Sequence, residues 1–379
     1  DATISVGYPG TIASLWQQAG RAGRGSSPSL AVFIGLDDPL DQYFMRHPQE
    51  LFGRPHEHAL INPGNVYILE QHLPCAAYEY PLSGTDEARF GSGLAVRSSA
   101  EAHGSTARPS SPRSELAEVS KPDQSNGFVE AMIHLEKRGV LAYRPEQDRW
   151  VYTGRAYPAQ EVSIRSIGGR PVALLDQSEN FRRLEEVDSV TAPARVHPGA
   201  IYLHQGESYL VTELDLDQGH ALLSPARVDY YTQPREVSDV RIVQSAQHRA
   251  LRSTLAYWGT LRVTRQVISF RRVRQYSEAV LGDELLDMPV QTFETKGLWW
   301  DVPPEWGRQV SRRGWDFVGG LHALEHATIG LLPLFAMCDR WDIGGVSYPV
   351  HPQTGTPVIF VYDGHPGGVG ITEKGFTLV

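Results

Sequence analysis

The stretch "QQAGRAGR", Gln17 to Arg24, decides how the N-terminal part of this chain is interpreted. It follows a short β-branched run at residues 4–6 and the turn signal "GYPGT". From residue 12 the apolar spacing becomes helical, and "LAVFIGL" at residues 30–36 then has the composition of a buried strand. A strand, a helix and a second strand in such close succession predict the end of an α/β unit with a parallel sheet.

Two arginines in this stretch, Arg21 and Arg24, each follow a glycine and lie near one face of the predicted helix. Guanidinium groups placed there can reach a polyphosphate bound on a neighbouring domain, and such an arginine stabilises the charge of a transferring phosphoryl group. Glycines beside them let two backbones approach closely. The alternative is a surface helix with two solvated arginines. The complete eight-residue string and its position after a strand favour the nucleotide interpretation.

The string resembles motif VI of superfamily-two helicases, Q-x-x-G-R-x-G-R. The resemblance implies that Gln17, Gly20, Arg21 and Arg24 contribute to the nucleotide site. Arg24 matches the arginine finger, Arg21 matches a group beside the γ-phosphate, and Gln17 contacts the nucleotide or couples the site to motion.

Longer strings narrow this resemblance, among them "DDPLDQYFMRHPQELFGR", "NPGNVYILEQHLPCAAYEYPL", "HPGAIYLHQGESYLV" and "HALEHATIGLLPLFAMCDRWDIGGVS". They resemble the mitomycin-repair-type (YprA/MrfA-like) DNA helicases over nearly the whole chain apart from the 83–115 linker. The resemblance implies ATP-driven 3′ to 5′ movement on single-stranded or 3′-tailed DNA during repair. It also implies that ATP and Mg²⁺ are held mainly by a half of the protein outside this chain, so the chain is expected to be a fragment.

The predicted fold class is multidomain, α/β and α+β. A helix at roughly 126–138, followed by the hairpin "VLAYRPEQDRWVYT", fits a winged-helix module. The ranges expected are 1–60 for the tail of a second RecA-like domain with a parallel sheet, 61–115 for a helical connector and polar linker, 116–190 for the winged-helix-like module, 191–300 for a β-rich module, and 301–379 for a truncated α+β C-terminal domain of zinc-binding type.

The segment "RVTRQVISFRRVR" is the candidate DNA contact, because it carries five arginines and no acidic residue. On an extended strand Arg262 and Arg272 would share a face, as would Arg265 and Arg271. A stripe of this kind follows a phosphate backbone. A solvated edge strand protected by charge remains an equal alternative. The arginines are Arg262, Arg265, Arg271, Arg272 and Arg274.

The pattern H-x-x-E-H occurs at His322, Glu325 and His326. In some metalloproteases it binds zinc, with the glutamate as general base. A third protein ligand would be needed, and Glu373 is the only glutamate that follows in the chain. The helix containing the pattern has an apolar side formed by Leu321 and other residues, so a polar contact beside the core is the preferred interpretation, with no metal ligands assigned.

The sequence also predicts what this chain does not do alone. None of its lysines follows a glycine, so there is no G-K-[ST] phosphate loop, and ATP hydrolysis by the chain alone is not expected. The family's zinc would be held by a downstream cysteine cluster. Because Cys75 and Cys338 are the only cysteines, the chain is expected to be zinc-free. No role is assigned to His365 or to either cysteine.

The net charge of −9 provides no global attraction to nucleic acid, so DNA binding requires local basic surface. The sequence contains no run of eighteen apolar residues, so no membrane span is expected. Two cysteines far apart in the chain suit a reducing cytoplasm. A non-enzymatic DNA-binding module remains the main alternative to a helicase.

Overall fold

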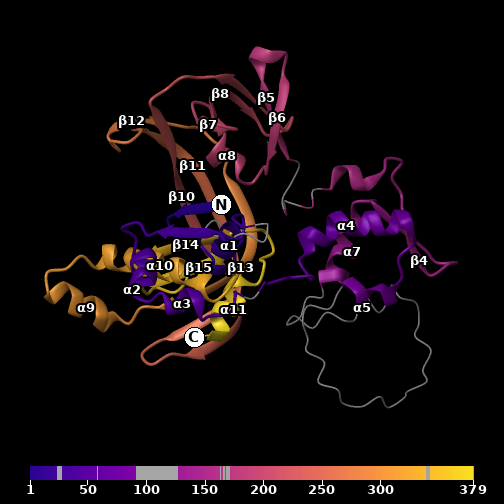
Figure 1. Ribbon diagram of the computed structural model, residues 1–379. Helices are drawn as coiled ribbons and strands as arrows, with labels where there is room; N and C mark the ends of the chain where they lie inside the picture. Colours follow the sequence, from indigo (N-terminus) through magenta and orange to yellow (C-terminus); the bar gives the residue numbers. More distant parts are fainter. Residues whose placement is uncertain are drawn as a thin grey trace.

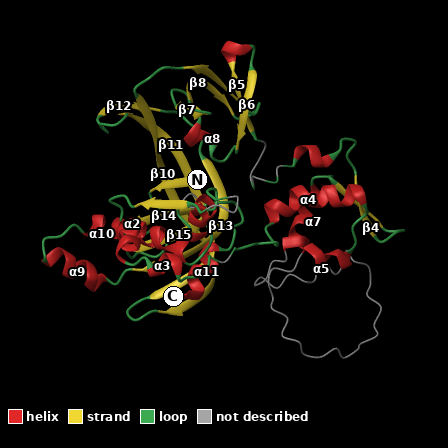
Figure 2. Ribbon diagram, in the orientation of Figure 1, coloured by secondary structure: helices red, strands yellow, loops and turns green. Residues whose placement is uncertain are grey.

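The computed structural model describes residues 1–23, 28–57, 59–90, 127–162, 164, 167, 171–338 and 342–378. Arg24 and most of the expected polar linker lie outside these described residues. Figure 1 shows a helical unit containing α4 and α7 beside a larger body, and Figure 2 shows that this body is built mainly from strands. Across the described residues, no helix combines the length and the apolar character that crossing a membrane requires.

The N-terminal unit has the predicted order of strand, helix and strand. β1 (Ala2–Val6) and β2 (Leu30–Ile34) pair in parallel, with α1 (Ile12–Ala19) between them in the chain. The expected burial of β2 is wrong, because Leu30 is 60% exposed and Ile34 47%. Among the described residues this sheet has two strands, and its apolar side chains are not covered on both faces as those of parallel sheets usually are.

Two buried carboxylates hold the turn that precedes α1. Asp41, 3% exposed, accepts hydrogen bonds from the backbone amides of Tyr8 and Leu36. Glu57, 8% exposed, accepts from the first two amides of α1 at 2.6 and 3.1 Å, where a negative charge also favours the helix dipole. These contacts fix where α1 begins. The next two helices are α2 (Pro39–Arg46) and α3 (Gln49–Phe52).

The helical unit contains the predicted helix and hairpin. In α7, Phe128, Met132 and Leu135 are each 1% exposed and form a buried apolar face, and the strands β3 and β4 are antiparallel. Asn65 caps α4, because its side-chain oxygen accepts a hydrogen bond from the amide of Tyr67. The elements are α4 (Val66–Glu79), η1 (Gly84–Asp86), α5 (Glu87–Phe90), α7 (Gly127–Lys137), β3 (Leu141–Arg144), β4 (Arg149–Tyr152) and η2 (Pro158–Glu161).

A five-stranded sheet follows, in the order β6-β5-β9-β8-β7. Its first two strands were placed by sequence in the 116–190 range, but they pair with this sheet and not with the β3–β4 hairpin. The elements are β5 (Val172–Asp176), η3 (Gln177–Glu179), β6 (Arg182–Val187), α8 (Ala192–Arg195), β7 (Ile201–His204), β8 (Glu207–Asp215) and β9 (His220–Pro225).

A six-stranded sheet joins the expected β-rich and C-terminal ranges into one body. Its order is β10-β11-β13-β15-β14, with β12 also paired to β11. Gly259 permits the long β10–β11 pairing to continue, because a Cβ there would lie 2.1 Å from the carbonyl oxygen of Gln244. The strands are β10 (Tyr230–Ala250), β11 (Leu255–Arg274), β12 (Val280–Leu285), β13 (Gln291–Asp301), β14 (Ile343–Tyr348) and β15 (Val358–Asp363).

The glycine-rich segment 364–370 connects the C-terminal body to the helical unit. Asn62 and Asn65 donate hydrogen bonds to the carbonyl oxygen of Gly368, at 3.0 and 2.9 Å. Gly367 has a φ of +76°, and a Cβ there would lie 2.7 Å from the Asn65 side chain, so glycine is required. The remaining helices are α9 (Pro304–Arg312), α10 (Phe317–Leu331), η4 (Leu332–Leu334) and α11 (Ile371–Leu378).

Candidate nucleotide, nucleic-acid and metal sites

Three of the four predicted nucleotide-contacting residues lie at the C-terminal end of α1. Gln17, Gly20 and Arg21 are all exposed there. Gly20 is the C-terminal cap with a φ of −69°, so it does not need the freedom of glycine for its backbone angle. Among the described residues Arg21 has no side-chain hydrogen bond or ion pair, which leaves its guanidinium available to an external anion. Arg24, the predicted arginine finger, lies outside the described residues.

The five arginines of the candidate DNA segment lie on β11, and all of them have partners. Arg271 donates two hydrogen bonds, of 2.8 and 3.2 Å, to the two carboxylate oxygens of Asp283 on β12. This bidentate pairing lowers the pKa of Asp283. Arg265 donates to the carbonyl oxygen of Val190 at 2.7 Å and to Gln291 at 3.0 Å. The other three pairs are Arg262–Glu294, Arg272–Glu284 and Arg274–Asp229.

The edge-strand alternative for this segment is wrong. β11 pairs with β10 on one side and with both β12 and β13 on the other, so it is an interior strand. Side chains do not alternate regularly between the two faces of β11. One extra residue near Ile268 forms a bulge opposite β10 and shifts the pairing register. Spacing therefore does not place Arg262 and Arg272 on one face. Four of the five arginines pair with acidic neighbours instead of protecting an open edge.

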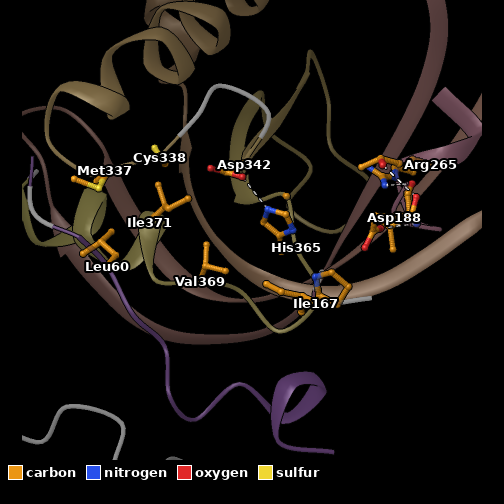
Figure 3. A pocket seen from close by; sticks show the side chains of 14 residues that line it. Leu60, Ile167, Asp188, Arg265, Met337, Cys338, Asp342, His365, Val369 and Ile371 are labelled. Carbon is orange, nitrogen blue, oxygen red and sulfur yellow. Dashed lines mark hydrogen bonds and ion pairs between the residues drawn. The ribbon is translucent and has the colours of Figure 1, made fainter. Parts of the chain in front are cut away.

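A cavity of about 490 Å³ lies between the 188–191 segment, β11 and the glycine-rich loop. Figure 3 shows His365 facing Asp342 across part of this cavity, and their side chains are 2.9 Å apart. Arg265 lines the cavity at its contact with the 188–191 segment. The sequence assigned His365 no role, and the structure gives it a specific carboxylate partner. That partner was hidden because Asp342 is separated from it by two strands.

The H-x-x-E-H residues form a cluster on α10. His326 Nε2 lies 3.1 Å from His322 Nε2, and His322 Nδ1 lies 3.3 Å from a carboxylate oxygen of Glu325. Glu325 is buried at 4% exposure, whereas both histidines are exposed. The expected apolar side is only partly buried, since Leu321 is 3% exposed but Leu324 is 40%.

Two protein-family profiles match parts of this chain. The profile of a family described as "MrfA Zn-binding domain" matches residues 324–379. A second, described as "ATP-dependent helicase HRQ1, winged helix domain", matches residues 61–167. The second match spans the helix and hairpin from which a winged-helix module was predicted.

Individual relatives cover nearly the whole chain. A Bacillus subtilis protein named "Uncharacterized ATP-dependent helicase YprA" is 31% identical over 98% of this chain and 45% of its own length. "ATP-dependent helicase hrq1" of Schizosaccharomyces pombe is 27% identical over 90% of the chain and 29% of its own length. The crystal structure of DUF1998 helicase MrfA bound to DNA aligns with a TM-score of 0.57 and 29% identity, over 99% of this chain and 45% of that one.

The winged-helix match and these relatives place the chain among proteins that are named as helicases. Within that class, the chain belongs to the YprA/MrfA/HRQ1-like DUF1998 helicases and corresponds to their C-terminal region, with a winged-helix domain and an MrfA-type zinc-binding domain. This confirms the family predicted from the sequence. The chain spans less than half the length of the relatives named above.

The expectation of a zinc-free chain is wrong. The zinc-binding domain profile matches residues 324–379 of this chain, and His322, Glu325 and His326 bring their ligand atoms within 4.8 Å of one another. Two imidazole nitrogens and one carboxylate oxygen are ligand types that zinc accepts, so the donor set fits the metal. The sequence argument failed because it considered cysteine ligands for zinc and dismissed this cluster as a polar contact.

Proposed function

We propose that this chain is the C-terminal part of an ATP-dependent DNA helicase that moves 3′ to 5′ on single-stranded DNA during repair in the cytoplasm. The observation that carries this proposal is the alignment over 99% of the chain with helicase MrfA, in a structure bound to DNA and AMPPNP. ATP and Mg²⁺ would be held mainly by a nucleotide-binding half outside this chain. Gln17, Arg21 and Arg24 would complete that site from the end of α1.

Coupling would follow from domain closure. ATP on the nucleotide-binding half draws Arg21 and Arg24 against the γ-phosphate, and hydrolysis releases them. The free Arg21 side chain and the anchored start of α1 support this role, because Glu57 fixes the helix while its other end remains exposed.

Strand separation by the protein with both halves tests the proposal. Duplexes with a 3′ tail should be unwound with ATP, whereas equivalent duplexes with a 5′ tail should not. DNA binding without any DNA-stimulated ATP hydrolysis would instead support the non-enzymatic DNA-binding module. Unwinding only from the 5′ tail would contradict the proposed direction.

A zinc protease is disfavoured by the cluster on α10. Among the described residues, the metal-ligating group contains only His322, Glu325 and His326. If Glu325 acted as general base, two histidines would remain, whereas catalytic zinc sites use three protein ligands.

We propose that arginines of β11 release their carboxylate partners when DNA binds and contact DNA phosphates in their place. Replacing Arg271 and Arg272 together with alanine should weaken single-strand binding and reduce the slope of log affinity against log salt by about 1–2 units. Fluorescence anisotropy at several salt concentrations measures both quantities. Arg183→Ala is the matched control, because Arg183 is also exposed and ion-paired but lies on β6.

The partners on β12 provide an opposite test. Replacing Asp283 and Glu284 with alanine frees the same two arginines, so it should strengthen DNA binding and steepen the salt dependence. Unchanged affinity and slope in both double variants would mean that these pairs only stabilise the β11–β12 hairpin.

A further inference from the structure

We propose that the outer surface of the helical unit binds single-stranded DNA by stacking unpaired bases on a group of tyrosines, with arginines beside them holding the phosphates. The end of α4, β4 and the segment that leads into η2 form this surface, which we call the tyrosine surface. The inference rests on the proposed function for the kind of polymer that is bound, and it adds a contact separate from the arginines of β11. The tyrosines are Tyr78, Tyr80, Tyr152 and Tyr157.

Most of these tyrosines are well exposed, although their rings are large and partly apolar. Tyr80 is 68% exposed, Tyr78 50% and Tyr157 47%. Figure 1 shows β4 on the side of the helical unit that lies away from the larger body, so that body does not cover them. Aromatic side chains that gather in one exposed place are typical of a surface that binds a partner.

The rings of the tyrosine surface are held in place by one another. The ring centroid of Tyr78 lies 5.4 Å from that of Tyr157 and 6.0 Å from that of Tyr152, with interplanar angles of 64° and 75°. Such edge-to-face pairs are favourable, and their rings do not cover one another as stacked rings would. Gly154 makes room for this arrangement, because a Cβ there would lie 2.1 Å from the hydroxyl oxygen of Tyr152. The positions of the rings are therefore built into the fold.

Three arginines of this region have no carboxylate partner. Among the described residues, Arg144, Arg149 and Arg155 make no ion pair. Arg144 lies opposite Arg149 in the β3–β4 hairpin, and the Arg149 guanidinium lies over the Tyr80 ring, 5.6 Å from its centroid. Most arginines of β11, by contrast, are paired with carboxylates that DNA would have to displace. Free guanidinium groups beside exposed aromatic rings suit a polymer in which phosphates alternate with bases.

The same observations favour unpaired bases over a duplex. In a duplex the faces of the bases stack on one another and only their edges are accessible, so a tyrosine ring can stack on bases only where the strand is single. Duplex recognition by a helix in the major groove is less well supported here. At the end of α7, His134 and Arg138 both contact Glu70, at 2.7 and 3.0 Å, so neither is free for a phosphate.

Equilibrium binding of oligonucleotides to the protein with both halves tests this inference. Replacing Tyr78 and Tyr80 with leucine removes two rings but keeps apolar side chains. The affinity for a single strand should fall by about 5- to 150-fold for each base that is no longer stacked. The slope of log affinity against log salt should stay the same, because the phosphate contacts remain. Tyr43→Leu on α2 is the matched control, since Tyr43 is 41% exposed but lies outside the tyrosine surface.

Two further measurements separate stacking from a loss of folding. The parent protein should bind a strand with bases more tightly than an abasic strand of the same length and charge. The leucine double variant should lose this preference and keep the Tm of the parent, whereas phenylalanine at both positions should retain the preference because the rings remain. Replacing Arg144 and Arg155 with alanine should instead lower the salt slope by about 1.4 units.

The outcomes distinguish this inference from the proposed function. If the parent binds single strands and the leucine variant binds them equally well, with the same preference for bases, the inference is overturned and the proposed function stands. The surface would then be left to a partner protein. Equal losses in the phenylalanine and leucine variants would also overturn base stacking. If the parent binds no single-stranded DNA, the inference and the proposed function both fail.

Discussion

Replacing Arg24 with alanine, in a protein that also carries the nucleotide-binding half, is expected to lower the rate of ATP hydrolysis by about 10³–10⁵-fold. The expected loss is large because an arginine supplied from outside the nucleotide site stabilises charge that develops mainly in the transition state. Binding of ATP and of DNA should change little. Steady-state hydrolysis with saturating single-stranded DNA measures the effect, and nucleotide and DNA affinities are measured in parallel.

Two further variants sharpen this test. Arg46→Ala on α2 removes another exposed arginine from the same N-terminal unit and should leave hydrolysis unchanged. Arg24→Lys keeps the charge but loses the planar fork, so it should recover only part of the rate. Normal turnover in Arg24→Ala would refute the assignment of the arginine finger. A parallel loss of DNA affinity would indicate damage to the fold and not to the chemistry.

The elements that the sequence predicted well are those determined by local pattern. The start of α1 follows from the turn before it and from its apolar spacing, and α7 with the β3–β4 hairpin lies within one continuous stretch of chain. The cap of α4 is harder to predict, because Asn62 and Asn65 are both residues that commonly cap helices. The choice depends on the carbonyl groups of a loop about three hundred residues away.

The sheets were harder to predict because their pairings are not local. β5 pairs in parallel with β9, and β13 pairs with β15 although α9, α10, η4 and β14 lie between them in the chain. The alternation of apolar and polar residues within a strand does not specify which distant strand it pairs with. Domain ranges drawn from composition therefore placed β5 with the helical unit, and they divided one six-stranded sheet between two modules.

The candidate sites show the same limitation in chemical terms. The arginines of β11 are visible in the sequence, but their acidic partners come from β12, β13 and the residues before β10. Whether Glu325 is buried depends on Gly345, which follows it by twenty positions and lies on another element. The sequence shows which residue types could bind a ligand, but it does not show which of their side chains are buried.

The largest effect on stability is expected from Asp363→Ala. Asp363 is fully buried at the end of β15 and accepts hydrogen bonds from the amides of Val369, Gly370 and Thr372, at 2.7–2.9 Å. Alanine would leave three donors unpaired at the start of α11, so the free energy of unfolding should fall by about 3–5 kcal/mol.

Urea unfolding followed by tryptophan fluorescence measures this loss, because Trp299 and Trp300 lie on β13, which pairs directly with β15. Asp363→Asn keeps one acceptor oxygen and should lose about half as much. Asp287→Ala removes an exposed carboxylate and should be nearly neutral. The same loop holds Asn65, so Asp363→Ala should also loosen the contact with the helical unit and raise amide exchange at the start of α4. Full stability in Asp363→Ala would mean that water replaces the carboxylate, and that the glycine-rich loop does not depend on this one side chain.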